Sequence, residues 1–278
     1  VIRDVLVSAG TNVQYGEGSV DSRLDLIGGE ASGNHYLTVD CIRRAARALK
    51  AKNVEKINGS YVAIIHPYTA YDLMQEAGEQ WVGISKYVNP ESILKGEIGT
   101  LGGVRFVEST EAKIYGPSEI SEGVSRLTCK SAVSSSATKI PVNEILSATT
   151  FSVPVPVYVN GAENTITAIE TSNGVSSVVL SSAVSSLEAG DIICGRGAGK
   201  DGSAVFCTLF IAENAYGVTD IEGGGLEHIV KQLGSAGTGD PINQRATVGW
   251  KAAISASVLA QEAMIRLETA STFESGAN

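Results

Sequence analysis

Apolar positions recur at helical spacing in one segment in the first quarter of the chain. This spacing predicts a helix from about Thr38 to Lys52, and the Thr38 hydroxyl can cap its first turn. Basic residues concentrate in its last turns, where they suit the helix dipole. The apolar stripe consists of Val39, Ile42, Ala46 and Leu49.

A row of basic side chains falls largely away from that stripe. It can face nucleic acid or an acidic neighbouring molecule, or it can be an ordinary solvated face held by salt bridges. The pattern leaves both interpretations open. The row consists of Arg43, Arg44, Arg47 and Lys50.

The apolar run Tyr61–Ile65 has the length of a buried strand, and a second helix is predicted directly after it. Pro67 suits the first helical position, and Gly78 suits the end of the helix. His66 lacks a nearby Asp or Cys at a spacing typical of a catalytic or metal site. A capping role is therefore the favoured interpretation of His66.

The remaining segments before residue 116 are shorter. Residues 1–36 are predicted to be strand and loop, with an extended piece at Val5–Val7. Asn89-Pro90 predicts a turn or short helix, Gly96–Gly103 a glycine-rich loop, and Val104–Val107 a strand.

From about Gly116, Ser, Val, Thr and Ala dominate, and short alternating runs appear. Pro154 and Pro156 predict that Phe151–Val159 is an edge strand or an extended segment. Asn160-Gly161 and Asn173-Gly174 predict hairpins. Residues 121–196 therefore predict a small all-β module, a barrel or a sandwich, set between flanks of mixed character.

After this module the pattern predicts further strands, with a glycine-rich turn at Gly223–Gly225 and a helical turn near Ser257–Ala263. The predicted strands are Ala204–Ala212, Glu227–Lys231, Val248–Ile254 and Ile265–Leu267.

Composition narrows the possible functions. The 278 residues can form one large domain or two small ones. A net charge of -9 argues against a protein that neutralises nucleic-acid phosphates over its whole surface. Charged residues make up 18% of the chain, against about 25% in a typical soluble domain. So few charges indicate that other subunits cover part of the surface.

The four cysteines are widely spaced and form no C-x-x-C, which predicts reduced, partly buried thiols. No apolar run has transmembrane length, so we expect a soluble protein made in a reducing compartment, with no membrane partner. The chain begins at Val1, from which we expect that upstream residues are cleaved, trimmed or disordered.

None of the motifs for phosphate binding, zinc binding or serine hydrolase activity is complete in this sequence. In Gly195–Gly202, Asp201 follows Lys200 where a phosphate-binding loop needs Ser or Thr, so an exposed turn is expected. His35, His66 and His228 are too dispersed for a zinc site, and there is no G-x-S-x-G motif. We therefore predict no catalytic, cofactor-binding or metal-binding residues, and no enzyme activity.

Two further features have weak functional interpretations. Asp220 and Glu222 flank a glycine-rich turn and could hold a cation, but no further acidic ligand has suitable spacing. Trp81 and Trp250 are interpreted as core or interface anchors rather than as stacking platforms for bases.

A set of ordered motifs resembles one family, the major capsid proteins of tailed bacteriophages, in particular those of podovirus type. The resemblance covers roughly residues 1–116 and 204–272. The motifs are Ile57-Asn58-Gly59, Tyr61–Ala63, His66-Pro67, Tyr71–Leu73, Gly96–Gly99, Gly103–Ser109, Asn243–Lys251 and Met264–Glu268.

The resemblance implies an α+β, Hong-Kong-phage-type viral capsid fold with a peripheral domain, an axial domain and a small all-β insertion domain. The 38–52 helix would be the spine helix of the peripheral domain. The implied division is 1–59 for an extended-loop remnant and the peripheral domain, 60–120 and 201–239 for the axial domain, 121–200 for the insertion domain, and 240–278 for the return to the peripheral domain.

The resemblance also implies a function. The chain would be a structural subunit that self-assembles into pentamers and hexamers of an icosahedral head around double-stranded DNA. Scaffolding, portal and decoration proteins would be partners, the DNA contact would be non-specific, and no cofactor would be needed. The protein would be located in the virion after assembly in the host cytoplasm.

Three alternatives remain open at this point. An encapsulin-type shell would enclose a cargo enzyme, and a phage surface-binding or decoration protein would use the β module without forming shells. A nucleotide-binding enzyme would use the 195–202 loop. We also hypothesise that Arg43 and Arg47 contribute to a neutral or basic inner face, or to contacts between capsomers.

Overall fold

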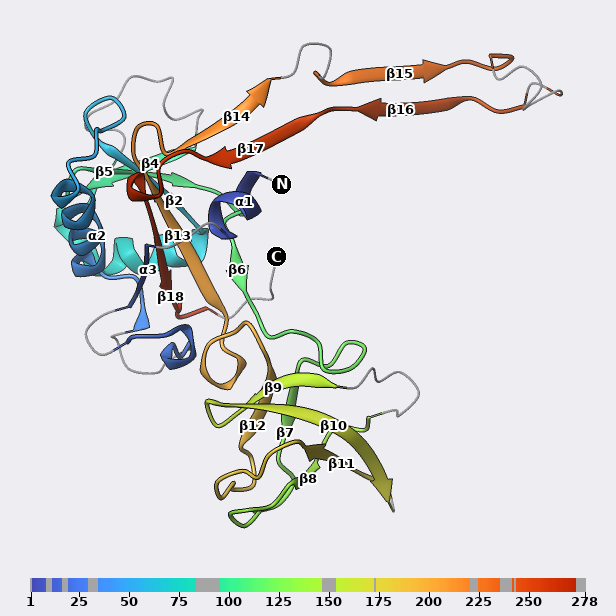
Figure 1. The fold of residues 1–278 in the computed structure, drawn as a ribbon. Coiled ribbons are helices and arrows are strands. Elements are labelled where there is room, and N and C mark those ends of the chain that lie inside the picture. Colours follow the sequence, from blue (N-terminus) through green and yellow to red (C-terminus); the bar gives the residue numbers. More distant parts are fainter. Residues whose placement is uncertain are drawn as a thin grey trace.

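The computed structural model places three structured parts along the chain: a large mixed sheet with helices, a second sheet, and a long two-stranded arm (Figure 1). No helix in its described part is long and apolar enough to cross a membrane. The residues that the structure describes are 2–8, 12–16, 20–29, 35–83, 96–146, 154–172, 174–220, 225–235, 242 and 244–273.

The large sheet mixes parallel and antiparallel pairs. Strands β1 and β2 run parallel to their partners β18 and β5, and the other pairs are antiparallel. The predicted strands Tyr61–Ile65 and Val104–Val107 are confirmed at its centre. In spatial order the strands are β1 (Val13–Tyr15), β18 (Met264–Thr269), β13 (Val205–Ile211), β2 (Tyr61–Ile65), β5 (Val104–Glu108), β4 (Glu97–Leu101) and β3 (Val82–Gly83), with β6 (Ile114–Tyr115) also paired to β13.

Helices cover both faces of this sheet. Paired residues of neighbouring strands share a face, so Ala63 and Phe210 point to one side and Ile64 and Leu209 to the other. The first side belongs to the core that contains the buried stripes of α2 (Val39–Ala51) and α3 (Pro67–Ala77). The second side faces α1 (Ile2–Ser8), whose Val7 carbonyl accepts a hydrogen bond from the Arg266 side chain.

The two predicted helices are confirmed with their caps. Thr38 Oγ1 accepts a hydrogen bond from the Cys41 amide at 3.3 Å, and Gly78 ends α3 with a φ of +48°. A link between the helices also forms, because Glu76 Oε2 accepts from the Val39 amide at 2.9 Å. This bond satisfies an amide that the first turn of α2 leaves without a helical partner.

Two sequence predictions in this part are wrong. Val5–Val7 lies in the helix α1 and not in an extended segment, because Leu6 and Val7 are buried against the sheet, and this packing outweighs the strand preference of valine. Gly96–Gly103 is largely the strand β4. A Cβ at Gly99 would lie 2.6 Å from the Trp81 ring, so the glycine is there for close packing and not for a loop.

The second sheet is antiparallel and has its own core of buried residues such as Leu127, Ile140 and Ile166. Its outer strands meet, because Lys130 N donates to Pro141 O at 2.9 Å and Asn143 N to Thr128 O at 3.0 Å. These bonds close the sheet into a small barrel. In spatial order the strands are β7 (Arg126–Thr128), β12 (Ile192–Gly195), β9 (Val155–Val159), β10 (Ala162–Ser172), β11 (Val175–Leu180) and β8 (Lys139–Val142).

The prediction of an edge strand at Phe151–Val159 is wrong, since β9 lies between β10 and β12. Pairing with β12 stops at Val157, so Pro156 lies where only β10 is a partner, and its missing N–H is tolerated there. The hairpin at Asn160-Gly161 is confirmed, with φ values of +51° and +80° as a type I′ turn needs. The hairpin between β10 and β11 is confirmed as well.

The arm consists of β14 (Tyr216–Asp220) paired with β17 (Ile254–Val258), and further out of β15 (Glu227–Lys231) paired with β16 (Thr247–Lys251). It extends away from both sheets (Figure 1). The 3₁₀ turns are η1 (Arg23–Asp25), η3 (Gly78–Gln80), η5 (Lys200–Gly202) and η7 (Gln261–Ala263). The predictions for Asn89-Pro90 and most of Gly223–Gly225 lie outside the described residues, as do Asn173 and Glu222.

Candidate functional surfaces

The arm presents apolar side chains to solvent along one face of each of its two segments. In the proximal segment, Val218 pairs with Ala256 and Tyr216 with Val258, so these side chains share one face. The opposite face carries Gly217, Thr219, Ser255 and Ser257. The proximal segment is therefore an amphipathic ribbon whose apolar face is about half exposed, with Val218 48% exposed and Val258 packed against the main core.

The distal segment repeats this arrangement. His228 pairs with Trp250 and Val230 with Val248 on one face. Trp250 is 73% exposed and Val248 71% exposed. The opposite face carries the ion pair between Lys251 and Glu227, at 2.8 Å.

An isolated two-stranded ribbon is at best marginally stable in water. Its strand edges carry unpaired N–H and C=O groups that can pair with another chain. Exposed apolar surface of this kind is typical of a surface that another molecule contacts. The sequence pattern predicted the strand Glu227–Lys231 and one strand at Val248–Ile254, but it did not predict β14, and it could not show that the distal segment extends away from the body. Trp250 was interpreted as a core or interface anchor, and its exposure places it outside the core.

The basic row of α2 divides into two groups. Arg44 donates 2.6 Å hydrogen bonds to the carbonyls of Tyr15 and Gly16, so it ties β1 to the helix. Arg43 donates to Gln80 Oε1 at 2.8 Å and stays exposed. Arg47 and Lys50 are also exposed. The exposed members leave a cationic strip available for an anionic partner.

The Gly195–Gly202 segment connects the barrel to β13. The expectation of an exposed turn is wrong here, because Arg196 is the only exposed residue of these eight. A Cβ at Gly195 would lie 1.9 Å from the Ser118 carbonyl oxygen, and one at Gly199 would lie 2.4 Å from the Leu26 oxygen. Lys200 N donates to the same Leu26 carbonyl at 2.8 Å. The glycines are therefore explained by close backbone packing and not by phosphate binding.

The three histidines occupy unrelated places. His66 Nδ1 accepts a hydrogen bond from the Tyr68 amide at 3.2 Å, which confirms the predicted capping role. His35 Nδ1 accepts from the Ile27 amide at 3.4 Å, and His228 lies on the arm. Within the described residues no group of three or more His, Cys, Asp or Glu could hold a metal ion.

The cap at His66 predicts a pH-dependent stability. Burial lowers the pKa of His66, so the unfolded chain, with a pKa of about 6.5, binds a proton more readily. The stability that the neutral, buried His66 contributes to the folded state is then fully present above about pH 6.5. It decreases as the pH falls below that value toward the pKa of His66 in the folded state. His66→Asn, which keeps a capping acceptor without titrating, should flatten this part of the profile in urea denaturation from pH 5 to 8. An unchanged slope would contradict the prediction.

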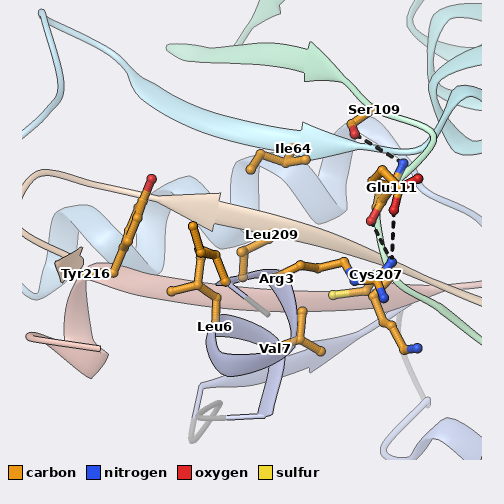
Figure 2. Close-up of a pocket in the computed structure, with 12 residues that line it drawn as sticks. Arg3, Leu6, Val7, Ile64, Ser109, Glu111, Cys207, Leu209 and Tyr216 are labelled. Carbon is orange, nitrogen blue, oxygen red and sulfur yellow. Dashed lines mark hydrogen bonds and ion pairs between the residues drawn. The ribbon is translucent and has the colours of Figure 1, made fainter. Parts of the chain in front are cut away.

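A pocket of about 190 Å³ lies between α1 and the second face of the large sheet (Figure 2). Leu6, Ile64 and Leu209 line its apolar part. Its polar rim is already bonded, because Arg3 Nη1 donates to the Glu111 carbonyl at 3.1 Å. The Glu111 amide donates to Ser109 Oγ at 3.2 Å.

Three of the thiols, those of Cys129, Cys194 and Cys207, have raised pKa values and are therefore poor nucleophiles. Cys207 lines the same pocket, but burial raises its pKa to about 12. Burial also raises the pKa values of Cys129 and Cys194 to about 11. All four cysteines are free, and all four are buried, which is more than the partial burial that the sequence predicted. The pocket therefore holds no activated nucleophile among these groups.

A buried cluster of charged side chains connects η1, β18 and the segment that follows the barrel. Glu268 is fully buried, and both of its oxygens accept from Arg23 at 2.6 and 2.7 Å, while Arg266 lies 2.9 Å away. Arg23 also donates to the Gly197 carbonyl and stacks 3.5 Å from the centre of the Tyr115 ring. Sequence reasoning missed this cluster, because 245 residues separate Arg23 from Glu268.

One comparison with known proteins identifies a family for this chain. The sequence model of a family described as phage capsid protein matches residues 5–150, about half of the chain. Among solved structures, the capsid of Ralstonia phage GP4 is 12% identical with a TM-score of 0.41. That match covers 93% of this chain but only 54% of the other, so this chain spans about half its length. The search of curated proteins finds no match.

Proposed function

The chain belongs to the phage capsid protein family, a structural component of the virion, and we propose that it is the major capsid protein of a phage head. In this proposal copies of the chain form pentamers and hexamers that close into an icosahedral shell around double-stranded DNA. Scaffolding, portal and decoration proteins are proposed partners, and assembly takes place in the host cytoplasm.

The single observation that carries the proposal is the exposed apolar face of the arm. A subunit of a shell makes heterologous contacts, in which one surface meets a different surface of the next copy, and such contacts close into rings. An arm that leaves the body and exposes Trp250 suits a contact of this kind.

We further propose that the large sheet with α2 and α3 forms a Hong-Kong-phage-type core. The proposed domain segments are 1–59, 60–120, 201–239 and 240–278, and each of them contributes at least one strand to this sheet, so the proposed peripheral and axial domains would share it. The barrel within 121–200 is proposed to be an insertion domain. Its separate core and its bonding to the rest of the chain near Ser118 and Arg196 support that proposal.

The cationic strip of α2 is proposed to face packaged DNA or a neighbouring capsomer. The double variant Arg43→Glu and Arg47→Glu should lower particle yield or DNA content, because it turns two exposed positive charges into negative ones. DNA per particle is measured by absorbance after purification. Particles with normal yield and normal DNA content would contradict the proposal.

The test of the main proposal is to produce the chain together with the head-assembly genes of its phage and to image the product by electron microscopy. Closed polyhedral shells, or sheets of pentamers and hexamers, are the expected result. Discrete monomers or trimers that bind preformed heads would instead identify a decoration protein. Shells that enclose an enzyme and no DNA would identify a nanocompartment.

A further inference from the structure

The barrel and the large sheet have separate cores, and the chain crosses between them twice (Figure 1). Residues 116–119 lead from β6 into the barrel, and residues 196–204 lead from β12 back to β13. Two domains with separate cores are expected to move relative to each other unless a further contact holds them. The glycines of the returning crossing would also suit a flexible hinge.

The two crossings are instead packed closely against each other. The Ser118 amide donates a hydrogen bond to the Arg196 carbonyl at 2.8 Å. A Cβ at Gly195 would lie 1.9 Å from the Ser118 carbonyl oxygen, and a Cβ at Gly197 would lie 3.0 Å from the Gly116 oxygen. These glycines therefore allow two backbones to approach each other, and the approach restricts their movement.

A third segment, residues 20–29, contacts the returning crossing. The Lys200 amide donates to the Leu26 carbonyl at 2.8 Å. A Cβ at Gly199 would lie 2.4 Å from the same carbonyl oxygen, so no other residue type fits there without a displacement. We call residues 20–29 the strap.

The strap is anchored on the large sheet. Val20 and Leu26 are buried in a small apolar cluster with Val205 of β13, and Leu26 is completely buried. The Gly29 amide donates to the Ser271 carbonyl, just after β18, at 3.2 Å. The strap therefore belongs to the body by its packing, although it also contacts the crossing.

Arg23 of the strap connects the body with both crossings. On the body side its guanidinium donates to the two carboxylate oxygens of the buried Glu268 at 2.6 and 2.7 Å. On the other side it donates to the Gly197 carbonyl at 3.3 Å and lies 3.5 Å from the centre of the Tyr115 ring, at the end of β6. A planar guanidinium bonded in this bidentate and stacked way has a fixed orientation.

We propose that the strap locks the barrel in one orientation relative to the large sheet. Two crossings alone permit rotation about the line that joins them, and a third contact anchored on the body removes that rotation. The lock does not depend on shell formation, so it can be tested on the unassembled full chain. In a shell of the proposed kind it would give every barrel the same orientation on its subunit.

The test measures the distance between the barrel and the body with two spin labels. Gln75→Cys on α3 and Ser135→Cys on the barrel carry the labels, because both positions are exposed. The native cysteines give little background, since all four are buried and burial raises the pKa values of Cys129, Cys194 and Cys207. Pulsed electron paramagnetic resonance should give a narrow distance distribution for this doubly labelled chain.

Gly199→Ala in the labelled chain should broaden or shift this distribution. The backbone at Gly199, with φ of −75° and ψ of −167°, is open to alanine, so the substitution acts through its contact with the Leu26 carbonyl. Gly28→Ala is the matched control, because its Cβ would meet its nearest neighbour, in Ser203, at an ordinary 3.5 Å. It lies in the strap and should leave the distribution unchanged.

Arg23→Ala is a second variant that removes the connection by other means, and it should broaden the same distribution. Because it also removes a partner of the buried Glu268, a second label pair, Gln75→Cys with Glu55→Cys, monitors the body in every variant. This pair should stay narrow in Gly199→Ala.

Three results would overturn the proposal. The first is a broad distance distribution between barrel and body in the chain with an unmodified strap. The second is an unchanged narrow distribution in Gly199→Ala, and the third is equal broadening in Gly28→Ala and Gly199→Ala. None of these results bears on whether the chain forms shells, so the lock and the proposed function can fail separately.

Discussion

Replacing Trp250 with alanine is expected to abolish shell formation while leaving the subunit itself folded. Trp250 is 73% exposed, so its removal creates no cavity in either core. Truncating a central aromatic anchor of an interface commonly costs about 2 kcal/mol or more, roughly a thirtyfold weaker contact. Because every contact in a shell repeats this loss, yield should fall far more than thirtyfold.

Particle yield by sedimentation and the thermal midpoint of unassembled subunits are the two measurements. Thr247→Ala is the control, since Thr247 lies on the opposite face of the same strand. It should assemble normally. A Trp250→Ala variant that forms shells at the normal yield would show that the arm's apolar face is not a subunit contact.

Replacing Glu268 with glutamine is expected to give the largest loss of subunit stability, about 3–5 kcal/mol. The carboxylate is completely buried and is the shared partner of Arg23 and Arg266. Removing its charge leaves two partly buried guanidinium groups uncompensated at the junction of η1, β18 and the barrel. Urea denaturation of unassembled subunits measures the effect.

The matched control is Glu170→Gln. Glu170 forms a 2.5 Å ion pair with Lys139 on the barrel, but both side chains are about half exposed. Solvent screening limits such a pair to about 1 kcal/mol or less. Similar losses from the two variants would mean that burial of the Glu268 cluster contributes nothing beyond a surface pair.

Local signals in the sequence were sufficient for several elements. Helices α2 and α3 have periodic apolar stripes, a capping Thr38 and a terminating Gly78, and each of these acts within a few residues. The turn at Asn160-Gly161 is similar, because positive φ is a property of the residues themselves. Such features need no knowledge of distant contacts.

The sequence predictions were wrong where contacts between residues far apart in the chain determine the local structure. Val5 and Val7 are strand formers by composition, yet packing against the sheet makes α1 a helix. Gly99 resembles a loop glycine until Trp81, 18 residues away, is placed against it. For the candidate surfaces, the alternation around Trp250 predicted a strand but carried no information on exposure. The partners of Glu268 were equally invisible in the sequence.

The two ends of the barrel segment lie side by side in the large sheet. β6 leads into the segment and β13 follows it, and these strands pair through Tyr115 with Val205 and Ile114 with Phe206. We therefore expect the large sheet to accept, in place of the barrel, another domain whose own termini lie close together. If the chain forms shells as proposed, with the barrel on their outer face, a foreign antigen or binding domain of that geometry could replace residues 121–195, and each particle would display one copy per subunit.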